Sequence, residues 1–499
     1  MDQNFHFESS RNGQVTCSFQ GKYLHSKYNP EGEGERFAES LEADFSPLCV
    51  FIIEPALSYC AKALKNRFPA AILCAIHFTK VFKDYDSDWD FVFYLDKNEM
   101  TASLSEDLFD ALGEEKLCSS LVYDWIAAKQ SFPEDNLLAW TEIKKAIIKA
   151  RGVIATRAYF SKRWTKNAIL FASNIQKPLL LKNGKCPLVI TASGPSLSSS
   201  LPFLKKYRDY FFLLALSSSY MPLTHYGLKP DLVISSDGGF WAKKHLCFPG
   251  QKNSVFALEC ESAVPGNIFL KAPVIPLAYP DGPGKELLKA AKIPFVISQR
   301  NGTVAGTALD FAMEITSGNI YFCGLDQAPS PALQHTQPNN LEIDNSKKDF
   351  RLRTSETRNT VSRFNSEQSL SIYRNWFKSN SKRYAKRVFR LSDDYKYDFT
   401  LGEIQDIGWE DFQKKESQTS KIKPEFTESK IITKTEERNS LIQNKLLEIS
   451  RKDEFINEVF PMESIIIKRQ ISNEEKENKI RELNEKMQDF LQECKKLLK

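Results

Sequence analysis

The sequence predicts an α/β protein with a central doubly wound, Rossmann-like domain. Short apolar runs of strand length alternate with helical patterns from Cys186 to about Asp326. Turns rich in glycine, serine and aspartate end several of these runs. The chain has 499 residues, of which 42% are hydrophobic, and this is enough to fill the cores of two or three domains.

The central domain opens with the stretch Pro187–Leu197, which reads as a strand, a tight loop and the start of a helix. Gly194 allows close backbone approach, and Pro195 suits a first helical turn. The free N–H groups and the Ser196 hydroxyl predict a seat for a nucleotide phosphate. A simple βα turn explains the same residues, because such turns favour glycine, proline and serine.

The first part of the chain, 1–176, predicts a smaller α/β domain. Strands are expected at 48–53, 71–76 and 89–95, a helix at 56–68, and a long linking helix or helix pair at 140–175. The turn after the first strand begins Glu54-Pro-Ala-Leu and lacks a glycine-rich loop. We therefore expect a degenerate, non-catalytic Rossmann-like domain here.

The central domain, 177–412, is expected to gather polar groups at one edge of its sheet. Strands at 188–190, 211–216, 232–234 and 320–322 lead to Ser193, Ser217, Asp237 and Asp326. Ligands of open parallel sheets bind outside the carboxyl ends of the strands, so these residues should converge. Further strands fit 255–258, 274–277 and 295–297.

A helix is expected at 368–387, and basic residues without an acidic one run from Arg374 to Arg390. This run is read as a solvated helix face, with an anion clamp as the alternative.

The last part, 413–499, predicts a charged helical region that begins with a mobile linker. Ser472-x-x-Glu475 forms a capping box, and apolar residues at 480, 483, 487, 490, 494 and 497 follow a coiled-coil seam. Because the seam is too short to stand alone, it would dock on a partner helix, pair with a second copy, or fold back on its own chain.

Composition excludes several classes of protein. The net charge of +5 is small against 68 basic and 63 acidic residues, which argues against a dedicated nucleic-acid binder. Ten cysteines without a CxxC pair fit a reducing compartment and predict no metal centre. The first residues lack a signal-peptide pattern, and no apolar run is long enough to span a membrane. We expect a cytoplasmic protein.

Four motifs carry a family resemblance: Ser193-Gly-Pro-Ser-Leu197, Gly227-Leu-Lys-Pro-Asp231, Asn301-Gly-Thr-Val-Ala305 and Ile320-Tyr-Phe-Cys-Gly-Leu-Asp326. In this order, over about 178–412, they resemble the motility-associated-factor (Maf) flagellin glycosyltransferases. Those proteins share a core with the archaeal hydroxymethylpterin diphosphokinases. The Gly-Pro-Ser-Leu loop is also similar to bacterial sialyltransferases that use a cytidine-monophosphate (CMP) sugar.

The resemblance implies a sialyltransferase-like domain that transfers a nonulosonic acid of the pseudaminic, legionaminic or sialic type. The donor would be the CMP-activated sugar, and the acceptor a serine or threonine of flagellin before export. His335 is the candidate base, and Asp326 either orients the substrate or caps the turn after its strand. The nucleotide sugar would be bound by Ser193, Gly194, Pro195, Ser196, Ser217, Asp237, Gly302 and Thr303.

This chain departs from the sialyltransferase pattern at some of these positions. The identity of the nucleotide and the need for a divalent cation therefore stay open. The sialyltransferases have asparagine where this chain has Ser217 and Asp237. An aspartate beside a phosphate is unfavourable unless it faces ribose hydroxyls or a cation.

Two further functions stay open. A diphosphokinase-like enzyme that uses ATP and Mg²⁺ would draw on Asp231, Asp237 and Asp326, although Asp231 follows Pro230 and is read as a strand-entry residue. A non-catalytic flagellin-binding adaptor is the third reading. The large N-terminal domain and the helical tail favour a macromolecular acceptor over a small pterin.

Overall fold

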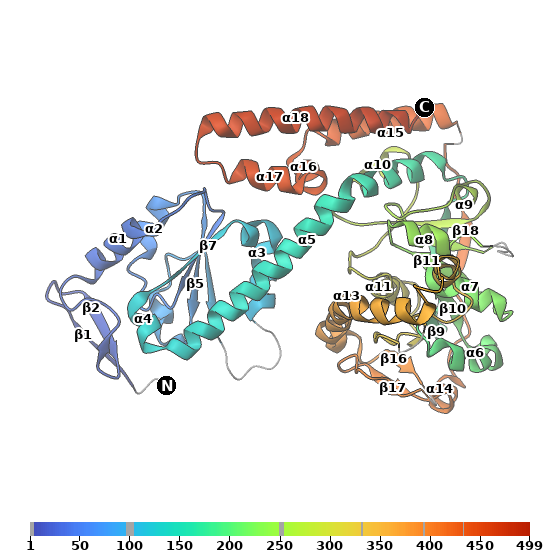
Figure 1. Ribbon diagram of the computed structural model, residues 1–499, viewed down its shortest axis with the longest axis horizontal. Helices are drawn as coiled ribbons and strands as arrows, with labels where there is room; N and C mark the ends of the chain where they lie inside the picture. Colours follow the sequence, from blue (N-terminus) through green and yellow to red (C-terminus); the bar gives the residue numbers. More distant parts are fainter. Residues whose placement is uncertain (1–3, 96–103, 249–253, 331–332, 393–394, 433) are drawn as a thin grey trace. The chain divides into compact units, whose positions relative to one another are not determined.

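The computed structural model describes residues 4–95, 104–248, 254–330, 333–392, 395–432 and 434–499. The chain forms two compact units (Figure 1). The first contains residues 1–161 and 456–489, and the second contains 162–455 and 490–499. This division differs from the expected boundaries at 176 and 412, because α5 (Pro133–Asn174) is continuous and the last part of the chain contributes to both units.

The first unit is built on a parallel four-stranded sheet in the order β6-β5-β4-β7, with a small antiparallel sheet β1-β2-β3. Alternate residues of β4 face two separate cores: Val50 and Ile52 pack into one, and Phe51 and Ile53 into the other. The strands are β1 (Phe5–Ser9), β2 (Val15–Phe19), β3 (Lys22–Tyr23), β4 (Cys49–Ile53), β5 (Ile72–His77), β6 (Phe91–Tyr94) and β7 (Ser120–Asp124), and the helices are α1 (Pro30–Ser40), α2 (Ala61–Arg67), α3 (Leu104–Cys118), α4 (Ile126–Ser131) and most of α5.

The second unit is built on a parallel nine-stranded sheet in the order β14-β13-β12-β11-β10-β9-β15-β16-β17. Its strands are β9 (Leu188–Thr191), β10 (Phe212–Leu216), β11 (Leu232–Ser235), β12 (Phe256–Glu259), β13 (Val274–Ala278), β14 (Val296–Ile297), β15 (Ile320–Cys323), β16 (Val388–Leu391) and β17 (Gln405–Ile407). Its helices are α6 (Leu197–Lys206), α7 (Ser217–His225), α8 (Phe240–His245), α9 (Gly266–Lys271), α10 (Pro283–Ala290), α11 (Val304–Ile315), α12 (Asn340–Ser346), α13 (Ser355–Tyr384), α14 (Trp409–Glu416) and α15 (Thr435–Ile449).

The sequence-based expectation of an α/β, Rossmann-like centre is confirmed. All seven strands expected between 188 and 322 are present, and α11 packs against β9, β10, β11 and β15 to form the main core. Strand β16 was not expected, because its third residue is a buried arginine, Arg390, which breaks the apolar pattern.

The end of the chain is more ordered than a mobile linker. Strand β18 (Glu425–Glu428) pairs antiparallel with β8 (Leu179–Lys182) in the second unit. Helices α16 (Asp453–Val459), α17 (Pro461–Lys468) and α18 (Asn473–Lys496) follow. Along the expected seam of α18, Leu483, Met487, Phe490 and Cys494 are buried within the chain itself, so the fold-back alternative holds for these residues. Among the described residues, no helix combines the length and apolarity that crossing a membrane requires.

Candidate functional site

The topology of the second unit creates a switch point between β9 and β15. After β9, the chain adds β10 to β14 on one side of it, and then places β15 on the other side. Loops that leave the carboxyl ends of two such strands run in opposite directions, which opens a crevice where ligands of α/β proteins bind. The expected convergence is therefore observed: β11, β10, β9 and β15 are adjacent, and their polar ends lie along one edge.

The loop after β9 touches the end of β15 directly. The Gly194 amide donates to the Gly324 carbonyl at 2.9 Å. A Cβ atom on Gly194 would lie only 2.6 Å from that carbonyl oxygen and 2.7 Å from Cγ of Asp326. Glycine at this position is thus required by the approach of the chain's own backbone, whether or not a phosphate binds there.

The donors of this loop that were expected to cradle phosphate already have partners. The Ser196 amide donates to Oδ2 of Asp326 at 3.0 Å, and the Ser196 hydroxyl donates to Oδ1. Pro195 lies in the turn before α6 and accepts a bond from the Ser198 amide. The hydrogen bonds between Ser196 and Asp326 join the end of β15 to the start of α6.

Asp326 is buried at the centre of this junction. Burial raises the pKa of its carboxyl group, and the Ser196 donors oppose that rise. These hydrogen bonds place the Asp326 carboxylate at the first turn of α6, across the switch point, and not in the turn directly after β15.

His335 reaches the same place from a later segment. The next residue, Thr336, donates its amide to the Ser193 carbonyl at 2.7 Å and its hydroxyl to the Gly194 carbonyl at 2.8 Å. Nδ1 of His335 is buried and has no hydrogen-bond partner among the described residues. The ring of His245, at the end of α8, has its centroid 6.5 Å away.

Burial lowers the pKa of His335, and it lowers the pKa of His245 to about 4. Both rings are therefore neutral at pH 7. A neutral imidazole has a lone pair that accepts a proton, which is the state a general base needs.

The remaining expected site residues lie further along the same edge. Ser217 begins α7 directly after β10, and Asn339 donates to the neighbouring Ser218 carbonyl at 3.3 Å. Asp237 follows β11 and accepts from the Gly239 amide at 2.7 Å. Burial and the charge of Asp237 raise the pKa of Tyr373 on α13.

Gly302 and Thr303 lead into α11, whose first turn lies at this edge. Gly302 has φ of +67°, a conformation that favours glycine, and Thr303 is the residue before the helix. The Ser236 hydroxyl lies 3.5 Å from that of Thr307, which connects the end of β11 to α11.

A buried acid at the end of β12 was missed by the sequence analysis. Glu259 accepts from the Ser298 hydroxyl at 2.6 Å and from the Tyr279 amide at 3.2 Å. Burial raises the pKa of Glu259 to about 7. The strand at 255–258 was expected, so the rule applied to the other strand ends would have found this residue.

Asp231 is at the opposite edge of the sheet, as its position after Pro230 indicated. It accepts from the Leu213 amide at 2.8 Å and pairs with Arg208 at 2.8 Å. Asp231 therefore cannot share a cation with Asp237 and Asp326. Within the ranges that the structure describes, no three histidine, cysteine, aspartate or glutamate side chains form a metal-binding group.

The basic run contains structural arginines in addition to exposed cations. Arg390 is buried, pairs with Asp406 at 2.7 Å and donates to the Leu325 carbonyl at 3.2 Å. Arg374 donates to the Gln327 carbonyl at 2.5 Å. Both hold the chain that leaves β15, which neither a solvated face nor an anion clamp describes.

Comparisons with known proteins agree with this architecture. Residues 162–331 match the family described as 6-hydroxymethylpterin diphosphokinase MptE-like. Two uncharacterised proteins of Treponema pallidum (strain Nichols) are similar: one is 27% identical over 316 residues, covering 63% of this chain and 69% of the relative. The other is 28% identical over 114 residues, covering 22% of this chain and 53% of the relative.

A solved structure of a Maf glycosyltransferase from Magnetospirillum magneticum AMB-1 superposes with a TM-score of 0.56. The match covers 99% of this chain and 92% of that one, at 11% identity. The resemblance inferred from the four motifs is thus confirmed at the level of the fold. This chain has the fold of a Maf glycosyltransferase, with a core segment that matches the MptE-like family.

Proposed function

We propose that this chain is a glycosyltransferase that moves a nonulosonic acid from a CMP-activated donor to serine or threonine of flagellin. The fold shared with a Maf glycosyltransferase supports the transferase class. The observation that carries the proposal is the placement of His335, which Thr336 anchors on the loop after β9 at the switch point.

The chemistry requires a base and a leaving group. The acceptor hydroxyl oxygen bonds to the anomeric carbon of the sugar, and the bond from that carbon to the CMP phosphate oxygen breaks. The hydroxyl proton passes to a base, and CMP leaves with the bonding electron pair. His335 suits this role because burial keeps its ring neutral and its Nδ1 without a partner among the described residues.

The other residues have positioning roles in this scheme. Asp326 fixes the start of α6 through Ser196 and so holds the loop after β9 in place. Ser217, Asp237, Gly302 and Thr303 line the edge from β10 to α11, where the nucleoside would lie.

The test is a transfer assay on purified flagellin with a CMP-activated nonulosonic acid, read by mass spectrometry. We expect His335→Ala to keep its affinity for CMP and to lose at least about 100-fold in transfer rate, because a general base contributes that much. The exposed His225 provides a matched control in His225→Ala, which should transfer at the wild-type rate. Unchanged turnover in His335→Ala would reject the assigned base.

A second function, transfer of diphosphate from ATP, is favoured by the MptE-like match alone. Thermal unfolding with CMP, CTP or Mg·ATP separates the two functions, since a ligand at about 100 times its Kd adds about 2.7 kcal/mol of stability. Preference for CMP supports the glycosyltransferase, and preference for Mg·ATP removes it. Stabilisation by a nucleotide without any turnover on flagellin would point to the adaptor.

A further inference from the structure

The outermost strand of the large sheet has a free edge. Strand β14 ends the strand order and pairs only with β13 among the described strands, through Leu277 with Val296 and Ala278 with Ile297. The Ser298 amide donates to the Ala278 carbonyl at 3.0 Å. Amides of successive strand residues point to opposite sides, so the N–H and C=O of Ile297 point away from β13. The Ile297 side chain is 45% exposed.

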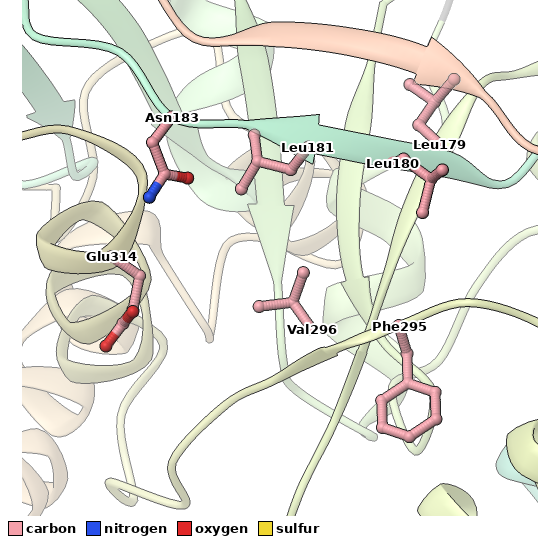
Figure 2. Close-up of a pocket in the computed structure, with 7 residues that line it drawn as sticks. All are labelled: Leu179, Leu180, Leu181, Asn183, Phe295, Val296 and Glu314. Carbon is pink, nitrogen blue, oxygen red and sulfur yellow. The ribbon is translucent and has the colours of Figure 1, made fainter.

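A hollow of about 300 Å³ lies beside the start of β14, with Phe295 and Val296 in its wall. Its apolar walls come from β8 and from the start of β14, and its polar groups are Asn183 and Glu314 (Figure 2). Figure 2 shows Asn183 and Glu314 together at one side of the hollow, with Leu181 and Val296 facing each other beside them. Glu314 is exposed, and no described residue forms an ion pair with it. The hollow therefore offers apolar contact along its length and one negative charge at its end.

These features together select one kind of occupant. An unpaired strand edge is satisfied by the backbone of another extended chain, and the neighbouring pocket then receives one of that chain's side chains. Lysine and arginine combine an apolar stem with a cationic head, which matches leucine and valine walls that end in a carboxylate.

The hollow is separate from the candidate site at the switch point. Glu314 lies in the last turn of α11, whereas Thr303 precedes the first turn of the same helix. A helix of 12 residues is about 18 Å long, so the two places lie at opposite ends of α11.

We infer that the outer edge of β14 and the adjoining hollow bind an extended segment of another polypeptide, which inserts a lysine or arginine side chain toward Glu314. This inference concerns partner recognition and does not depend on the reaction at the switch point.

The test uses fluorescence anisotropy with a labelled peptide of alternating valine and threonine around one central lysine, and with the same peptide carrying a central glutamate. We expect the wild-type chain to bind the lysine peptide at least about tenfold more tightly. Glu314→Lys should reverse this preference. The exposed Glu403 gives the matched control, since Glu403→Lys makes the same charge change elsewhere on the second unit and should leave both affinities unchanged.

A second pair of variants tests the strand edge itself. Ile297→Pro removes an N–H that points away from β13, so the sheet should stay intact. The affinity for the lysine peptide should fall by about tenfold or more. Ile297→Thr keeps the N–H and should bind as the wild type does. Equal affinity of the wild type for both peptides would overturn the inference. A wild-type dimer that Ile297→Pro converts to a monomer in gel filtration would also overturn it, because the occupant would then be a second copy.

Discussion

Replacing His77 with glutamine should change how the stability of the first unit depends on pH. Nδ1 of His77 lies 2.8 Å from Oε1 of Glu54, and Nε2 lies 2.9 Å from Oδ1 of Asp86. The imidazole and the Glu54 carboxylate are fully buried. Two carboxylates around one ring are best satisfied when both ring nitrogens carry hydrogen, so the folded state favours the imidazolium.

The magnitude follows from the pKa of this ring. Burial alone would lower the pKa of His77, but Glu54 and Asp86 raise it to about 9 from 6.5. Each pKa unit corresponds to about 1.4 kcal/mol, so protonated His77 adds about 3 kcal/mol to the free energy of unfolding. Because the folded pKa is the higher one, this contribution is fully present below 6.5 and is lost as the pH rises through about 9.

Hydrogen exchange of peptides from β4 and β5, corrected for intrinsic rates, reports the free energy of opening this sheet. Between about pH 6 and about pH 8.5, the free energy of opening should fall by about 2 kcal/mol in the wild-type chain and should not show this fall in His77→Gln. Tyr94 donates to Asp86 at 3.2 Å, and its pKa is raised to about 12, so it stays protonated in this range in the folded state. Identical pH dependence in the two proteins would show that His77 is not charged in the folded state.

Two further variants test the second unit. Gly194→Ala places a Cβ against the Gly324 carbonyl and should lower the free energy of unfolding of this unit by about 2 kcal/mol in chemical denaturation. Gly266→Ala is the control and should cost far less, because a Cβ there meets nothing within 4 Å. Equal effects of the two variants would show that the position of Gly194 is not crowded. Glu259→Gln should stabilise the same unit by about 2 kcal/mol at pH 8 and much less near pH 4. Burial raises the pKa of the Glu259 carboxyl to about 7, so the wild type loses stability as the pH rises from 4.5 through that value, whereas glutamine does not titrate. A Glu259→Gln protein with unchanged stability at pH 8 would place the Glu259 carboxylate in a more polar setting than its burial indicates.

The strands of the large sheet could be predicted because each is a short apolar run with a polar turn after it. The two added strands on the far side of β15 could not, since β16 carries Arg390 and β17 reads Gln-Asp-Ile. Their stability depends on partners remote in sequence, such as Asp406 for Arg390. The hydrophobic pattern of a short segment cannot show which distant residue will pair with a buried arginine.

The position of the candidate site was also predictable, but the internal contacts of its residues were not. The strand ends at Ser193, Ser217, Asp237 and Asp326 were expected to gather at one edge, and the strands β9, β10, β11 and β15 are indeed neighbours in the sheet. The sequence could not show that Asp326 takes the donors of Ser196, because the two residues are 130 positions apart. The carboxylate partners of His77 lie 23 and 9 positions away in the sequence, and no motif connects them to it.

The two units share a parallel-sheet topology, and their switch points are occupied differently. In the first unit, β4 and β7 flank the switch point, and the chain fills it with its own buried groups: the Leu57 amide donates to Nε2 of His25 at 3.0 Å, and Trp125 donates to the Leu24 carbonyl at 2.7 Å. In the second unit, Nδ1 of His335 is buried with no partner among the described residues. A buried polar atom left without a partner costs about 1–3 kcal/mol, which a ligand recovers when it supplies the partner. That difference favours the second unit as the place where substrate binds.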